Sequence, residues 1–204
     1  EIAKIWGEKN KYQIWLSIEI AAAQAMEKLK LIPKGVASTV RKKAKINVDR
    51  IHKIENKVHH DMIAFLSSIT EKVGNHGKFL HKGMTSSDVL DTCFNFQLVQ
   101  ASKILKKDID EILQVLKNKS LRYKNTICIG RSHGIHAEPT TFGLKLASFY
   151  EEFKRNKKRL ERAVKEISTC AISGAVGTFA NVDPRVEAHV AKKMGLKIEP
   201  ISSQ

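Results

Sequence analysis

The longest helical pattern in the sequence extends from Val89 to about Lys119, and it constrains the fold more than any other feature. Apolar residues recur in it at intervals of 7, 4, 3 and 4 positions, which places them on one side of an α-helix. The members of this stripe are Leu98, Leu105, Ile109, Ile112 and Leu116. A helix of this length with a single apolar stripe is typical of a helical bundle.

Shorter helical patterns precede this stretch. A first amphipathic pattern begins near Tyr12 and ends at Pro33, which stops helices. A second pattern covers residues 48–58, and a third covers residues 62–69 and is closed by Gly74. The sequence before the long stretch therefore predicts a group of short helices.

After the long stretch the pattern is less regular. A brief β-branched segment at residues 126–130 is compatible with an extended strand. Pro139 then suits the first turn of a second long helix, and residues 186–194 form a last short helix before Gly195. Two long helices and a short one do not make a self-sufficient bundle, so the sequence looks like part of something larger.

The expected fold class is therefore all-α. We expect a small N-terminal helical domain at residues 1–84, followed at residues 85–204 by the first long helices of a central bundle. We expect the remainder of that bundle and a C-terminal domain to lie outside this chain.

The net charge of +15 raises the question of a nucleic-acid partner. Basic residues are, however, mixed with glutamates along residues 151–166, as on a solvated helix face: Glu151 and Arg155, for example, stand four positions apart. Aromatic residues make up 6% of the chain, which is too few for base-stacking platforms. We therefore expect a basic enzyme with an anionic substrate and no nucleic-acid partner.

The cysteines and apolar runs bear on location and on metals. Cys93, Cys128 and Cys170 lie far apart, as reduced thiols of a cytoplasmic protein do. No apolar run approaches the ~20 residues of a membrane span, and the first residues lack the pattern of a signal peptide. Neither H-E-x-x-H nor a Cys/His quartet occurs, so no metal site is expected.

Three polar clusters interrupt the helical pattern: HHD at residues 59–61, HKGMTSSD at residues 81–88 and RSHGIHAEP at residues 131–139. They contain five of the eight histidines, and each lies next to an expected helix boundary. They are the candidate functional segments of the chain.

Each cluster also has a purely structural interpretation. Thr85-x-x-Asp88 is a capping box, although a helix N-terminus with spare hydroxyls is also a ready anion site. HHD is by default a surface cluster, with metal ligation as the alternative. The histidines before Pro139 would precede a positive helix end, where one could act as a general acid or could simply cap and pack.

Taken together, the clusters resemble the fumarase/aspartase superfamily and, within it, the adenylosuccinate lyase family. The matching stretches follow the family order and cover nearly the whole chain; they are HHDMIAF, HKGMTSSDVLDT, GRSHGIHAEPTTFGLKLA, ISGAVGTFANVDP and EPISSQ. Related lyases that act on argininosuccinate, aspartate or malate carry a shorter G-x-T/S-H-x-Q pattern at the third stretch.

The resemblance implies a fumarase/aspartase-like helical fold and a C–N lyase that needs no cofactor. It implies elimination of fumarate from adenylosuccinate, giving AMP, and from succinylaminoimidazole carboxamide ribotide (SAICAR), giving AICAR, in purine biosynthesis. It also implies a homotetramer whose active sites are shared between subunits.

The resemblance assigns roles to single residues. It makes His133 the proton donor to the departing nitrogen, with His60 in a supporting role. It places Thr85 and Ser86 on the succinyl carboxylate. The substrate-binding positions that it implies are His59, His60, Asp61, His81 (on the phosphate side), Thr85, Ser86 and Gln204. The family usually has arginine at the position of His59.

The resemblance also implies that part of the active site lies elsewhere. The family's catalytic base is a serine in a Gly/Ser-rich loop farther along, and this sequence contains no such motif. We therefore expect the chain to correspond to the N-terminal half of a lyase and to be inactive by itself. Two alternatives stay open: another superfamily lyase or cycloisomerase, and a non-catalytic basic helical module for assembly or nucleic-acid binding.

Overall fold

A computed structural model of the chain describes residues 1–202. The chain forms two compact units, residues 1–99 together with the segment from Ile167 onward, and residues 100–166. The predicted helical class is confirmed, since most of the described residues lie in helices and their strands form two sheets of two strands each. The domain boundary expected after residue 84 stays a prediction.

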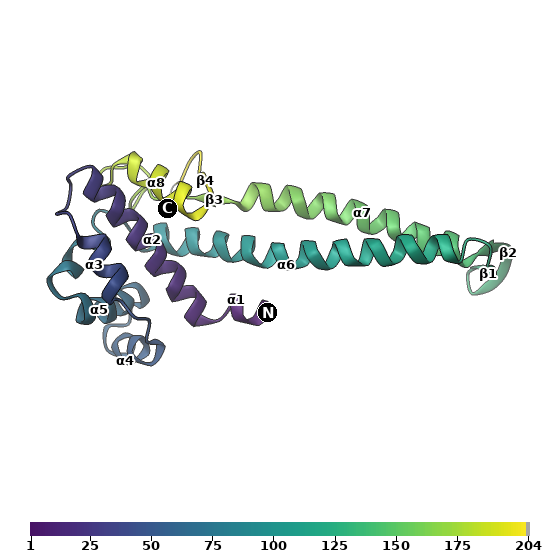
Figure 1. Cartoon of the computed structure of the whole chain (residues 1–204), viewed down its shortest axis with the longest axis horizontal. Helices are drawn as coiled ribbons and strands as arrows, with labels where there is room; N and C mark the ends of the chain where they lie inside the picture. The colour runs from purple at the N-terminus through teal and green to yellow at the C-terminus, as the bar shows by residue number, and fades with distance from the viewer. Residues whose placement is uncertain (203–204) are drawn as a thin grey trace. The chain divides into compact units, whose positions relative to one another are not determined.

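The first unit is built mainly from short helices, and α2 lies between α3 and α8 (Figure 1). Its elements are α1 (Ile2–Ile5), α2 (Glu8–Lys28), α3 (Val36–Lys43), α4 (Val48–Val58), α5 (Asp61–Val73), the 3-10 helix η1 (Gly74–Phe79), the start of α6 (Ser86–Arg122), β3 (Thr169–Cys170), α8 (Pro184–Met194) and β4 (Lys197–Ile198). The predicted helix ends at Gly74 and Gly195 are confirmed, because these residues are the C-caps of α5 and α8.

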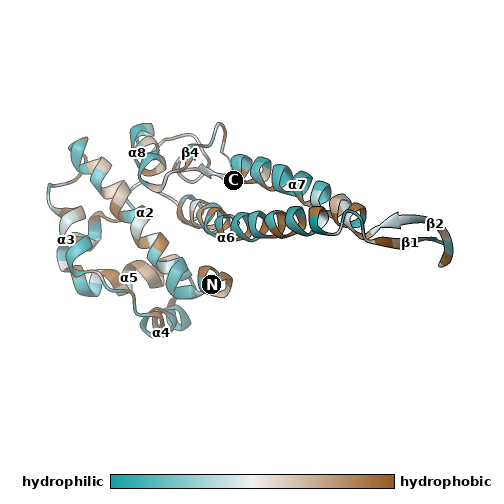
Figure 2. Cartoon of the chain, turned by 45° about the vertical axis from the view of Figure 1, so that its right-hand side comes forward, coloured by the Kyte–Doolittle hydropathy of each residue, from teal (hydrophilic) through white to brown (hydrophobic). Residues whose placement is uncertain are grey.

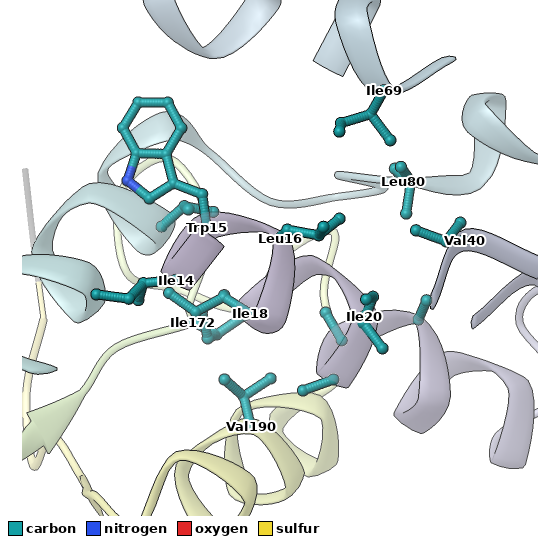
Figure 3. Packing of buried hydrophobic residues seen from close by; sticks show 14 of the residues in the cluster. Ile14, Trp15, Leu16, Ile18, Ile20, Val40, Ile69, Leu80, Ile172 and Val190 are labelled. Carbon is teal, nitrogen blue, oxygen red and sulfur yellow. The ribbon is translucent and has the colours of Figure 1, made fainter. Parts of the chain in front are cut away.

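The core of the first unit surrounds α2. Tyr12 and Trp15 of this helix pack on Phe65 of α5, with ring centroids 5.9 Å and 5.4 Å apart. Ile172 and Val190 come from the C-terminal segment and lie close to α2 (Figure 3). Burial of each such side chain contributes about 1.5–3 kcal/mol, so the C-terminal segment is an integral part of this core.

The second unit is a helical hairpin with a β-ribbon at its turn. It consists of most of α6, of β1 (Ile127–Ser132), β2 (Ile135–Thr141) and α7 (Phe142–Ile167). The two helices run antiparallel, because Lys106 of α6 pairs with Glu161 of α7 at 3.0 Å and Asp110 pairs with Lys157 at 2.5 Å. These pairs are well exposed, so they fix the register of the helices more than they stabilise them.

Pro139 does not begin the second long helix, as the sequence had predicted. It lies in β2 opposite Ile129, and α7 begins at Phe142. A proline lacks an N–H but is tolerated in a two-stranded ribbon, where each strand has a free edge. Thr141 caps the helix instead: its Oγ1 accepts a hydrogen bond from Leu144 N at 3.2 Å. The prediction that the histidines directly precede a helix end is therefore wrong.

Large apolar side chains remain uncovered on the second unit. Hydrophobic and hydrophilic residues recur along α6 (Figure 2). The exposed members on the two helices include Leu105, Ile112, Val115, Leu121, Leu144 and Phe149, each at least 38% exposed. Part of the predicted apolar stripe is thus open on the surface. No helix in residues 1–202 is both long enough and apolar enough to cross a membrane.

Gly143, near the start of α7, allows a close approach of the backbone. A Cβ at this position would lie 2.6 Å from the Cα and N atoms of Lys124. Replacing glycine by alanine inside a helix ordinarily stabilises it by about 1 kcal/mol. We expect Gly143→Ala to lower the thermal unfolding midpoint instead, as measured by circular dichroism. Ser148→Ala, at an exposed position of the same helix, is the control and should not lower it. A raised midpoint for Gly143→Ala would contradict the close approach.

Candidate active site

The first histidine cluster forms the junction between α4 and α5. His59 ends α4 in the left-handed conformation (φ 51°), and its N–H donates to Glu55 O at 2.7 Å. His60 is the N-cap of α5, and its Nδ1 accepts a long hydrogen bond of 3.5 Å from Ile63 N. Asp61 Oδ1 lies 3.6 Å from His60 Nδ1. The imidazole and the carboxylate are therefore neighbours, which the extended backbone of His60 makes possible.

His81 is held by a buried carboxylate of α2. Oε2 of Glu19 accepts a hydrogen bond from the backbone N–H of His81 at 2.8 Å, and Oε1 lies 2.7 Å from ring Nδ1. The Glu19 side chain is 1% exposed, whereas that of His81 is 17% exposed. No sequence motif singled out Glu19, because it falls among the apolar residues of the first helix.

The carboxylate of Asp88 joins the start of α6 to the loop that follows β3. Oδ2 accepts from Thr85 N at 2.9 Å, which is the carboxylate half of the predicted capping box. The same carboxylate accepts from Ser173 N at 2.9 Å and from Gly174 N at 3.1 Å. Asp88 is 4% exposed, and a buried carboxylate is tolerated where several N–H groups surround it.

The same two loops approach each other closely. Gly83 has a positive φ of 73°, and a Cβ at this position would overlap the carbonyl oxygen of Asn181. Ser173 Oγ is hydrogen-bonded to Ser202 Oγ. These serines, with Ser87 and others, line a cavity of about 20 Å³, which is room for roughly one water molecule. The described part of the chain therefore leaves little internal space between these two loops.

Burial also raises the pKa values of three other groups of the first unit. Burial raises the pKa of Glu187, the hydrogen bond from Ile172 N opposes this, and the Asp88 carboxylate raises it further. Burial also raises the pKa of the Cys170 thiol to about 12 and that of Cys93 to about 12. Both thiols are therefore protonated at neutral pH and inert.

His133 lies in the turn between β1 and β2. Ser132 and Ile135 pair across the ribbon, so His133 and Gly134 are the two turn residues. Their φ angles are both positive, 50° and 75°, which is the pattern of a type I′ hairpin turn. The side chain of His133 is exposed and makes no hydrogen bond or ion pair within residues 1–202.

The structure brings one group of the sequence-predicted positions together. His81, Thr85 and Ser86 lie on one short segment, which Glu19 and Asp88 fix to the rest of the first unit. Thr85 and Ser86 stand at the N-terminus of α6, where free backbone amides favour anions.

The other site residues predicted from the sequence lie in different parts of the chain. His60 and Asp61 belong to the first unit, but within residues 1–202 neither forms a hydrogen bond or ion pair with the 81–88 segment. His133 belongs to the second unit, and Gln204 lies outside the described residues. In the described part of the chain, no three His, Cys, Asp or Glu side chains are grouped so as to hold a metal ion.

Comparison with known proteins places the chain in a family of lyases. A family model described as Lyase matches residues 1–204, and the chain belongs to this family. It is 50% identical over 200 residues to the adenylosuccinate lyase of Thermotoga maritima, covering 98% of this chain and 46% of that protein. It is 46% identical over 204 residues to the adenylosuccinate lyase of Bacillus subtilis, covering 100% of this chain and 47% of that protein. The chain spans about half the length of the curated relatives it matches.

Solved structures show the same fold. A fumarate lyase from Mesorhizobium sp. BNC1 superposes with a TM-score of 0.93 at 24% identity, over 98% of this chain and 49% of that one. A β-carboxy-cis,cis-muconate cycloisomerase from Acinetobacter calcoaceticus sp. ADP1 gives a TM-score of 0.90 at 24% identity, over 98% and 49% of the two chains. At this level of identity the comparison supports the fold alone. The superposition confirms the predicted fumarase/aspartase-like architecture.

Asp88→Asn should destabilise the first unit. An asparagine retains one acceptor oxygen and turns an NH₂ toward backbone donors, so at least one hydrogen bond to a charged group is lost, at a cost of about 2 kcal/mol or more. We expect urea unfolding to show a lower midpoint. The control is Asp91→Asn, one turn farther along α6, because Asp91 is exposed and accepts no hydrogen bond in the described chain. Equal midpoints for the two variants would exclude the proposed importance of Asp88.

Proposed function

We propose that this chain is part of an adenylosuccinate lyase, which eliminates fumarate from adenylosuccinate, giving AMP, and from SAICAR, giving AICAR. The observation that carries the proposal is an identity of 46–50% to curated adenylosuccinate lyases over 98–100% of this chain. The reaction belongs to purine nucleotide biosynthesis, and it requires no cofactor or metal.

The elimination breaks a C–N bond, and it needs a base at the succinyl carbon and an acid at the departing nitrogen. We assign the acid to His133. Its imidazole is exposed and unpartnered within residues 1–202, and an imidazole can donate a proton near neutral pH. The base is assigned to the family's serine loop, a motif that this sequence does not contain.

Substrate binding is assigned to the helix boundaries of the first unit. Thr85 and Ser86 offer hydroxyls at the N-terminus of the 37-residue helix α6, which favours the succinyl carboxylate. His60 supports the acid: it is the N-cap of α5, and its Nδ1 lies 3.6 Å from Asp61 Oδ1. We also assign substrate binding to His59, Asp61 and Gln204. His81 is assigned to bind the substrate on its phosphate side.

The partner proposed for this chain, apart from its small-molecule substrates, is itself. We assign it to a homotetramer with shared active sites, located in the cytoplasm, with neither nucleic acid nor membrane as a partner. The exposed apolar residues of the second unit favour association, because such patches ordinarily mark interfaces. The division of the assigned residues between two units is compatible with sites completed by other subunits.

The association can be tested with Leu105→Glu in the full-length protein. Leu105 is 46% exposed in this chain, and a charge buried in an interface would cost several kcal/mol. We expect light scattering to show dissociation to smaller species with loss of activity. The control is Lys103→Glu, a charge change at an exposed position on the same helix. A fully active monomer, of either the wild type or the variant, would exclude shared sites.

Replacing the proposed acid tests the mechanism. In the full-length enzyme, His133→Gln should reduce turnover of adenylosuccinate by about a hundredfold or more with a smaller change in KM, since general-acid catalysis contributes ~10²–10⁴. Turnover is followed by the absorbance change of the substrate. The control is His136→Gln, the other exposed histidine of the ribbon, which should remain within a few-fold of wild type.

Two further measurements make this test decisive. His133→Asn suits the left-handed backbone of the turn, so its inactivity would separate acid chemistry from turn strain. The 204-residue chain alone should show no turnover, because it supplies an acid without the base. Wild-type turnover by either His133 variant would show that the acid is elsewhere. A full-length enzyme that releases no fumarate would favour a cycloisomerase or a non-catalytic module.

A further inference from the structure

The contacts of Glu19 point to a role for a residue that none of the assignments above includes. We propose that Glu19 is a positioning residue, which fixes the imidazole of His81 so that its Nε2 faces the ligand. This inference rests on the proposed function, because it concerns how the phosphate side of that site is built.

Glu19 determines which ring nitrogen of His81 carries a proton. Glu19 Oε1 lies 2.7 Å from Nδ1 of His81, and an ionised carboxylate can only accept hydrogen bonds. Nδ1 therefore carries a proton, and Nε2 is the nitrogen left for a ligand. Among the described residues, the only buried side-chain nitrogen or oxygen without a hydrogen-bond partner is Nε2 of His189. Nε2 of His81 has no hydrogen-bond partner in residues 1–202 either, so it is not buried. Nε2 of His81 consequently reaches solvent.

Glu19 also binds the backbone of His81. Glu19 Oε2 accepts from the N–H of His81 at 2.8 Å, and His81 has a φ of 58°. A left-handed backbone conformation costs free energy in a residue other than glycine, so it persists only where surrounding contacts hold it. The same turn continues with a hydrogen bond of 3.2 Å from Met84 N to His81 O and leads directly to Thr85. One carboxylate thus fixes both the ring and the turn that precedes the helix N-terminus.

The negative charge of Glu19 needs a partner. Burying a carboxylate is strongly unfavourable unless it is paired and hydrogen-bonded, and Glu19 is 1% exposed between Ile18 and Ile20. Nε2 can donate to a phosphate only when the ring carries both protons. The buried Glu19 carboxylate is then the counter-charge of that imidazolium and orients the ring through Nδ1. A cap for one backbone N–H would not require this arrangement.

The chain contains a matched control on the same helix. Glu27 also accepts a hydrogen bond from a backbone amide of another helix, Ala37 N at 2.7 Å, but within residues 1–202 no hydrogen bond or ion pair joins it to a histidine. Glu27→Gln therefore reports the general effect of neutralising a glutamate of α2. Glu19→Gln adds the specific effect on His81, because the glutamine amide can turn an NH₂ toward Nδ1.

The ring can be read directly by ¹⁵N NMR of histidine-labelled 204-residue chain, with His81→Asn used to identify its signals. We expect Nδ1 of His81 to be protonated in the wild type. Glu19→Gln should shift the proton toward Nε2, whereas Glu27→Gln should leave it on Nδ1. A wild-type ring with its proton on Nε2 alone, or a Glu19→Gln ring unchanged from wild type, would overturn the proposal. Circular dichroism verifies that each variant folds.

Kinetics of the full-length enzyme supply the second readout. We expect Glu19→Gln to raise KM for adenylosuccinate by about tenfold, with a smaller change in kcat, since one charge-assisted contact is weakened. In a Glu19→Gln/His81→Asn double variant the two effects should not multiply, because they act through one ring. Multiplying effects would overturn the positioning role. If the wild type lacks lyase activity, the proposed function fails, while the NMR result still decides whether Glu19 orients His81.

Discussion

A single buried carboxylate, that of Asp88, connects the start of α6 to the loop that follows β3. It accepts hydrogen bonds from the residue that precedes α6 and from two residues about 85 positions later in the chain. Because these three N–H groups donate to one carboxylate, the start of the long helix and the loop after β3 are fixed together. The location of Thr85 and Ser86 is therefore a property of the tertiary structure and not only of a local cap.

The regular helices could be predicted from the sequence because their apolar residues follow the helical period. The second pattern, residues 48–58, coincides with α4, and Gly195 ends α8 as expected. The short helix α3 was missed, since eight residues carry too little periodicity. The extended segment expected at residues 126–130 is confirmed, since it overlaps β1, but the second strand and the turn of the ribbon were missed. His133-Gly134 is an uncommon pair for a type I′ turn, and Pro139 is a stronger signal for a helix start than for a strand.

The candidate site was predictable where the chemistry is local. Clusters of histidines and hydroxyls that interrupt the helical pattern, with the resemblance they carry, identified the three segments. The residues that hold those segments were not predictable, because their partners are distant in the sequence. Glu19 and His81 are 62 positions apart, and neither periodicity nor a motif indicates such a pair. Buried polar contacts of this kind become visible only when the fold is known.

The two-residue turn that carries His133 has a consequence for how this loop can change during evolution. Inserting or deleting one residue would replace the type I′ turn and reverse the faces of the ribbon side chains relative to one another. Gly130 adds to this restriction, because a Cβ at this position would lie 2.7 Å from Glu138 O in the opposite strand. The length of this loop is consequently expected to stay constant.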